Sequence, residues 1–167
     1  ASLGYEFVNE QIMRIDSEHI HQEIVKPSLA LLCSNPIYKG ADDEYRTAFE
    51  NYKKGEYEQV LSECNKAIES CIIAIIEKNS WDLPGQKTMQ PLIYECKKRG
   101  LFSSVEEEHL NKVTNLIKSV SAQRSQSSSH GQGTQLRDVP ATLASYVLHL
   151  TATNIVFLIR TESNFKP

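Results

Sequence analysis

The segment Tyr57–Lys78 limits the possible folds of this chain more than any other stretch. Its apolar residues recur at steps of three and four, the spacing of one helix face. These residues are Tyr57, Val60, Leu61, Cys64, Ala67, Ile68, Cys71, Ile72, Ile75 and Ile76. In its second half the apolar positions extend nearly all round the helix, which is typical of a helix with no side facing water. The pattern therefore predicts a long helix at the centre of a helical core.

A first helix is predicted before this segment, with Asp16 as its N-cap. Pro27 should kink it or end its first half, because proline lacks a backbone N–H and clashes with the preceding turn. The sequence Ser-Asn-Pro at 34–36 should end it. The apolar residues expected on its buried face are Ile20, Ile24 and Leu31.

Four further helices follow from start and stop signals. Helices at about 42–54 and 90–99 should end at Gly55 and Gly100, because glycine readily adopts the left-handed conformation found after helices. Ser103 and Glu106 form a capping box that opens the next helix. Asp138 should cap the last helix, to about Arg160, with Pro140 inside its first turn. The residues that the capping-box helix should bury are Leu110, Val113, Ile117 and Val120.

Six helical segments with short connections predict an all-α helical bundle. A length of 167 residues is that of one domain, expected at 16–162 with a tail at 163–167. Residues 1–15 are expected to be an N-terminal extension or a short β-hairpin around Asn9-Glu10, at the end of a longer protein. A tetratricopeptide-like helix hairpin at 48–67 is an alternative, but it occurs only once.

Composition excludes several classes of protein. A net charge of −3 and a pI near 6 exclude a generally basic nucleic-acid binder, so any RNA contact needs a local patch. The longest uninterrupted aliphatic and aromatic run, Ile155–Ile159, is too short to indicate a membrane span. The four cysteines, at 33, 64, 71 and 96, contain no C-x-x-C pair and are expected to be reduced thiols. With no signal-peptide pattern, these features predict a cytoplasmic protein without a metal or other cofactor.

Arg124 and His130 form the motif most able to carry chemistry. Val113, Ile117 and Val120 step toward Arg124, so the buried stripe would end in a guanidinium. On a continuous helix His130 would lie about 120° away, but the serine run and Gly131 and Gly133 can fold it back. A histidine can take the proton of a ribose 2′-OH, and an arginine can stabilise charge on phosphorus. On spacing alone, a capping arginine and a loop histidine are the commoner explanation, because such pairs often occur by chance.

Three stretches resemble the HEPN superfamily, and more closely its abortive-infection C-terminal group. They are the sequence from Arg14 to Pro27, Glu63–Glu69 in the long apolar helix, and His130-Gly-Gln-Gly133 with the helix that follows at 144–158. The likeness covers roughly residues 14 to 162. It implies a helical bundle that forms a homodimer, with arginine and histidine from both copies in one cleft.

The resemblance also implies an activity, a metal-independent endoribonuclease that leaves a 2′,3′-cyclic phosphate and acts in bacterial antiviral defence or as a toxin. Arg124 and His130 match the catalytic pair of the family, and Gly131, Gly133 and Glu63 are expected to support them. Ser125 stands where the family usually has asparagine, and serine has a shorter side chain with only a hydroxyl. The alternative is therefore a non-catalytic dimerisation or regulatory module for an N-terminal effector or sensor region.

Overall fold

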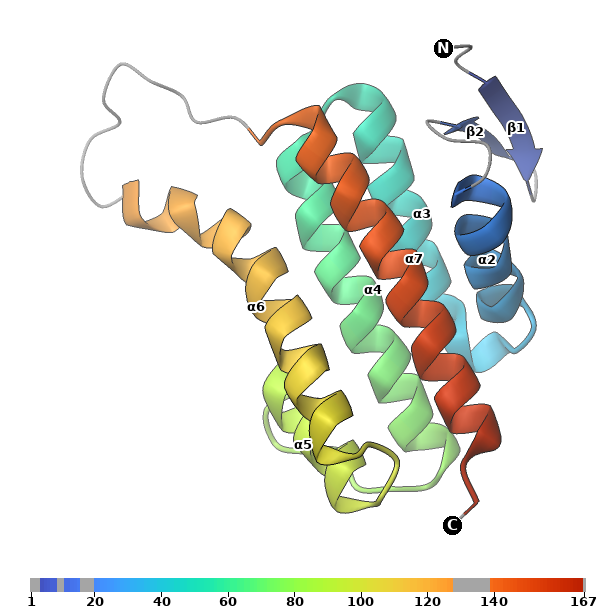
Figure 1. Cartoon of the computed structure of the whole chain (residues 1–167), viewed down its shortest axis with the longest axis vertical. Coiled ribbons are helices and arrows are strands. Elements are labelled where there is room, and N and C mark those ends of the chain that lie inside the picture. The colour runs from blue at the N-terminus through green and yellow to red at the C-terminus, as the bar shows by residue number, and fades with distance from the viewer. Residues whose placement is uncertain (1–3, 9–10, 16–19, 128–138, 167) are drawn as a thin grey trace.

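The computed structural model describes residues 4–8, 11–15, 20–127 and 139–166, with side chains described at 20, 22–117 and 139–166. These residues form six α-helices after an N-terminal hairpin (Figure 1). The helices are α2 (Lys26–Cys33), α3 (Lys39–Lys54), α4 (Tyr57–Lys78), α5 (Met89–Lys98), α6 (Ser104–Ser127) and α7 (Ala141–Asn164). A π-helical turn, η1 (His21–Val25), precedes α2, and a 3-10 turn, η2 (Pro36–Tyr38), precedes α3. The predicted all-α bundle is confirmed.

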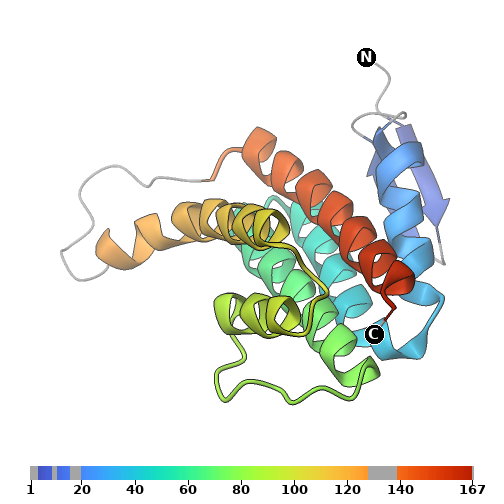
Figure 2. The ribbon, with the colours of Figure 1, turned by 60° about the horizontal axis from the view of Figure 1, so that its bottom comes forward.

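Helix α4 is the centre of the bundle, as its sequence predicts. It packs most extensively against α3 and α7, and it also contacts α5 and α6 (Figures 1 and 2). Because α4 has neighbours on several sides, apolar residues nearly all round its second half can leave water together. Its buried residues are Val60, Leu61, Cys64, Ala67, Ile68, Cys71, Ile72, Ala74, Ile75 and Ile76.

The turn between α3 and α4 is set by Gly55. This residue has φ 79°, a left-handed conformation that costs glycine little, and its N–H donates to the Tyr52 carbonyl. The end of α3 is therefore where the sequence predicts it. Its start is three residues earlier than predicted, because η2, capped by Asn35, runs directly into α3. The 48–67 stretch is an ordinary helix hairpin within the bundle.

The buried face of α2 differs from the prediction. Val25, Leu29 and Leu32 are at most 1% exposed, whereas Ile24 and Leu31 are only partly buried. The π-helical turn η1 explains the difference, since a wider turn takes in an extra residue and moves the buried face one position along the chain. Pro27 lies in the first turn of α2, directly after η1, so it stands where the π-helical turn ends and the α-helix begins. Asp16 is outside the described residues.

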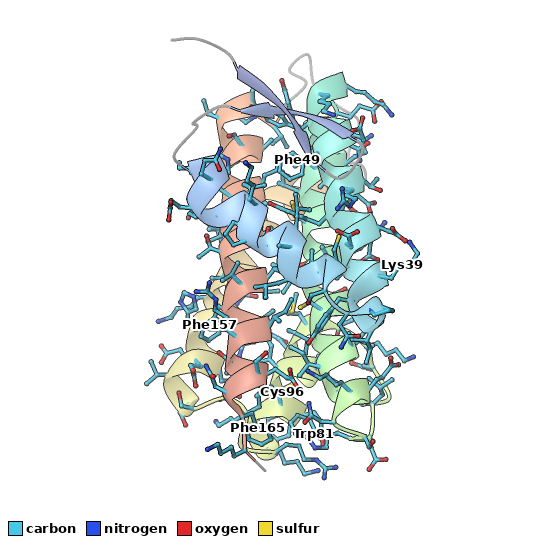
Figure 3. The ribbon with its side chains drawn as sticks, turned by 90° about the vertical axis from the view of Figure 1, so that its right-hand side faces the viewer. Lys39, Phe49, Trp81, Cys96, Phe157 and Phe165 are labelled. Carbon is cyan, nitrogen blue, oxygen red and sulfur yellow. The ribbon has the colours of Figure 1, made fainter. Side chains whose placement is uncertain are left out.

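The N-terminal hairpin is present and lies against the α2 side of the molecule (Figures 1 and 3). Strand β1 (Gly4–Val8) pairs antiparallel with β2 (Gln11–Ile15), with Gly4 opposite Ile15 and Val8 opposite Gln11. These are the only strands among the residues that the structure describes.

Helix α7 crosses the bundle beside α4 and is also hydrogen-bonded to α3. Tyr45 of α3 is fully buried, and its hydroxyl donates to the Leu148 carbonyl at 3.1 Å. The prediction that Pro140 lies inside the first turn is wrong. Pro140 has ψ 144° and is the N-cap, so the helix begins only at Ala141, and Asp138 lies outside the described residues.

Candidate functional site

Helix α6 carries Arg124 and Ser125, and its start is fixed by the predicted capping box. The N–H of Ser103 donates to Oε2 of Glu106 at 2.7 Å, and the N–H of Glu106 donates to Oγ of Ser103 at 3.3 Å. These two bonds satisfy backbone donors that the helix itself leaves without partners. Lys97 of α5 forms an ion pair with Glu107 in the first turn of α6. The first turn of α6 is therefore stabilised by its own capping hydrogen bonds and by an ion pair with α5.

The inner face of α6 runs toward position 124. Leu110, Val113 and Ile117 are buried, as predicted, against α4 and α5. Arg124 follows Ile117 by seven residues, and the helix is continuous between them, so both positions lie on nearly the same helix face. Helix α6 continues through positions 124 and 125 and ends at Ser127.

The remaining residues of the motif cannot be compared with their predicted positions. His130, Gly131 and Gly133 lie outside the described residues, and so do the side chains of Arg124 and Ser125. Convergence of the arginine and the histidine therefore stays a prediction. The backbone gives its setting: the end of α6 leans away from α4, and the start of α7 lies at the same end of the bundle (Figures 1 and 2).

Glu63, the acidic residue expected to support the site, already has a cationic partner. Its Oε1 accepts from Nζ of Lys66 at 2.6 Å, and its side chain is 17% exposed. The negative charge of Glu63 also raises the pKa of the Glu44 carboxyl on α3, so the Glu63 carboxylate lies along the contact between α3 and α4. Pairing between Glu63 and Arg124 is not tested, since the arginine side chain is not described.

Glu44 is an acidic group that the sequence did not single out. Burial raises the pKa of its carboxyl, and the negative charges of Glu63 and Glu69 raise it further. A hydrogen bond with Ser70 and the charge of Lys66 act in the opposite direction. No sequence pattern marks Glu44, because its partners lie on the next helix.

The basic run 97–99 at the end of α5 is neutralised by carboxylates. Lys97 pairs with Glu107, while Nζ of Lys98 lies 3.6 Å from Glu95. Arg99 also donates to Glu95, at 2.8 Å, and this contact holds the pKa of the Glu95 carboxyl below its ordinary value. A contact of this run with an RNA backbone would have to compete with these ion pairs.

The thiols agree with the predicted reduced state. All four cysteines are free; Cys64, Cys71 and Cys96 are buried and Cys33 is exposed. Burial raises the pKa of each buried thiol to about 12, so these groups stay protonated near neutral pH. Within the described part of the chain, no group of three or more His, Cys, Asp and Glu side chains is arranged to hold a metal ion.

Helix α7 has two properties that the apolar runs of the sequence did not reveal. It is long and apolar enough to cross a membrane by length and composition, with half of its most apolar window buried inside the bundle. The core helix of a soluble bundle passes the same test, so this is weak evidence for a span. Tyr146, near the start of α7, is 50% exposed although the helix is mostly buried.

Comparison with known families identifies the fold. A sequence model described as a HEPN-like domain (Abi_C) matches residues 39–162, which is more than half of the chain. The match includes α3 to α7 and both residues of the Arg124–His130 motif. Comparison with curated proteins and with solved structures finds no match. The helical bundle and the extent of the family match together show that this chain belongs to the HEPN-like Abi_C family.

Proposed function

We propose that this chain is a metal-independent endoribonuclease domain of a bacterial abortive-infection or toxin protein. The observation that carries the proposal is the family match over 39–162, because it includes the only Arg-x5-His pattern on α6 and the segment after it. In the proposal two copies associate, and Arg124 and His130 of both line one cleft. The domain acts in the bacterial cytoplasm, under the control of an N-terminal effector or sensor region.

The proposed reaction needs only groups that the chain supplies. His130 takes the proton of a ribose 2′-OH as the 2′ oxygen attacks the adjacent phosphorus. The bond from phosphorus to the 5′ oxygen then breaks, and that oxygen receives a proton from a histidine in its charged form. The products are a 2′,3′-cyclic phosphate and a 5′-hydroxyl. Arg124 stabilises the negative charge on the phosphorane oxygens through its paired N–H donors.

Ser125 favours a second candidate function. At this position the HEPN enzymes that the chain resembles usually have asparagine, which donates and accepts hydrogen bonds at once. A serine there leaves part of that bonding capacity unfilled. The second candidate is a non-catalytic dimerisation module that regulates an N-terminal effector.

Cleavage of labelled single-stranded RNA in EDTA tests the proposal. Wild type should cut, and His130→Ala and Arg124→Ala should each lose at least about 100-fold in rate, the usual contribution of a general acid or base. His109→Ala is the matched control, because His109 is an exposed histidine on the same helix α6. It should cut at the wild-type rate.

The products and a third variant separate the two candidate functions. Ends that carry a 2′,3′-cyclic phosphate support the proposed reaction, and Ser125→Asn should then raise the rate. If wild type and Ser125→Asn both leave the RNA intact at concentrations where the chain is associated, the proposed activity of this domain is contradicted and the regulatory function is favoured. Cleavage that EDTA abolishes contradicts the metal-independent mechanism.

A further inference from the structure

The end of α2 brings a thiol, a carboxylate and a guanidinium together at the surface. Cys33 is the last residue of α2 and is exposed. Its thiol donates to Oδ2 of Asp42 with a separation of 3.8 Å, and Nη2 of Arg46 donates to the same sulfur at 3.4 Å. Asp42 and Arg46 both belong to α3. We call Cys33, Asp42 and Arg46 the thiol cluster.

The two charged members of the thiol cluster hold one another in place. Nε of Arg46 donates to Oδ2 of Asp42 at 2.9 Å, and the two side chains are only 13% and 15% exposed. They lie one turn apart on a single helix, so their spacing does not depend on a loop. A nucleophile within hydrogen-bond reach of a carboxylate that a third group orients is a typical arrangement of a reactive site. The cluster is therefore more than an exposed cysteine.

The opposite charges of Arg46 and Asp42 work against each other at the sulfur. The guanidinium stabilises a thiolate at Cys33, whereas the carboxylate destabilises it. The cluster therefore favours the recognition of an incoming group over a general rise in the reactivity of the thiol. A ligand with an ammonium and a carboxylate beside its own sulfur would meet a group of opposite charge at each of them.

Asp42 can accept more hydrogen bonds than it receives. Its Oδ1 is shielded from water and has no hydrogen-bond partner among the residues that the structure describes. When Cys33 enters a disulfide it loses its S–H, so Oδ2 loses a donor as well. Removing donors from a shielded carboxylate costs free energy, so a new donor attached to the sulfur is favoured. An ammonium is such a donor, while a carboxylate can accept from further N–H groups of Arg46.

We propose that Cys33 is a modification site that forms a mixed disulfide with a cysteine-type thiol, which carries an ammonium and a carboxylate next to its sulfur. The co-reactant is the small disulfide of that thiol. The Cys33 thiolate attacks one of its sulfurs, the S–S bond of the small disulfide breaks, and the other half leaves as a thiolate that takes up the proton lost by Cys33. The protein thiol is oxidised and the released half is reduced, and the reverse exchange restores the thiol.

This modification site is separate from the proposed nuclease motif. Helices α2 and α6 lie on opposite sides of α4 and α7 (Figures 1 and 2). The other three thiols are buried, so an adduct on the folded chain is confined to Cys33. The inference therefore does not rest on the proposed function, and either can fail while the other holds.

Rates of adduct formation on the full chain, followed by mass spectrometry, test the proposal. The probes are cystine, whose two halves each carry both charged groups, and the uncharged 2-hydroxyethyl disulfide. Wild type should gain one adduct per chain from each probe, and Cys33→Ser should gain none. The ratio of the cystine rate to the 2-hydroxyethyl disulfide rate should fall about fivefold in Arg46→Gln, the size of one charge-assisted contact near the surface. The ratio cancels any change in the reactivity of the thiol itself.

Arg99→Gln is the matched control. Nε of Arg99 donates to a carboxylate four residues earlier on α5, just as Nε of Arg46 does on α3. This variant should keep the wild-type ratio. Arg46→Lys retains the charge that pairs with Asp42 but loses the paired N–H donors, so it should also lower the ratio, and it carries the test if circular dichroism shows that Arg46→Gln is unfolded. A wild-type ratio in the folded Arg46 variants, or a cystine adduct on Cys33→Ser, overturns the proposal.

Discussion

Replacing Lys78 by methionine should destabilise the bundle far more than replacing an exposed lysine. Lys78 ends α4, and its Nζ lies 2.6 Å from Oε2 of Glu162 near the end of α7. The Glu162 side chain is only 6% exposed, and its other partner is Nδ2 of Asn79 at 3.3 Å. The Lys78→Met variant keeps the aliphatic stem but leaves a buried carboxylate with one neutral donor.

The size of the effect follows from the exposure of the two partners. Breaking a fully buried ion pair costs about 3–5 kcal/mol, and breaking an exposed one costs about 0–1 kcal/mol. Because Glu162 is buried and the Lys78 side chain is 37% exposed, we expect a loss of about 2 kcal/mol. Lys112→Met is the control: its pair with Glu108 has the same 2.6 Å separation, but the side chains are 73% and 66% exposed. It should leave the stability almost unchanged, because water screens an exposed pair.

Urea unfolding followed by circular dichroism measures both variants. With a slope of about 2 kcal/mol per molar urea, the midpoint should fall by about 1 M for Lys78→Met and by less than about 0.3 M for Lys112→Met. Added salt should narrow the difference only slightly, since a buried pair is weakly screened. Equal midpoints for the two variants would refute the argument that burial decides the strength of this contact.

Three further predictions concern the reactivity of the thiols, the pH dependence of stability and the glycines. A disulfide reagent at pH 8 should react quickly with one thiol, which Cys33→Ser removes, and with the three buried thiols only after unfolding. Burial raises the pKa of Cys64, Cys71 and Cys96 to about 12, above the ordinary value of 9.0. The contribution of these thiols to stability is therefore complete below about pH 9 and is lost as the pH rises toward 12. A urea midpoint that stays constant from pH 8 to 11 contradicts this fall in stability. Gly55→Ala should lower the melting temperature by about 3 °C, since alanine is strained at φ 79°. Gly40→Ala should raise the melting temperature slightly. Gly40 lies inside α3, and the added methyl group meets only Cβ of Ser70, at 3.9 Å. Calorimetry should give shifts of opposite sign.

The candidate site can be proposed from its residue types, but the convergence of those residues stays a prediction. The Arg124–His130 spacing and its chemistry are visible in the sequence, and the family match covers both residues. The position of Arg124 on nearly the same helix face as Ile117 could also be predicted, because both residues belong to one continuous helix. Whether His130 turns back toward Arg124 depends on residues 128–138, and no local repeat in the sequence predicts their arrangement.

Features that depend on residues close together in the chain could be predicted from the sequence alone. The spacing of the apolar residues in α4, the left-handed turn at Gly55 and the capping box of Ser103 and Glu106 each depend on residues a few positions apart, so their predictions are confirmed.

The burial of a residue and its charged partners depend on segments far away in the chain, so only the folded structure shows them. The π-helical turn moved the buried face of α2 to Val25, Leu29 and Leu32. The packing of α7 buried Glu162 beside Lys78 and left Tyr146 exposed. Burial and electrostatics are sums over contacts between distant segments, and a sequence read a few residues at a time does not contain those sums.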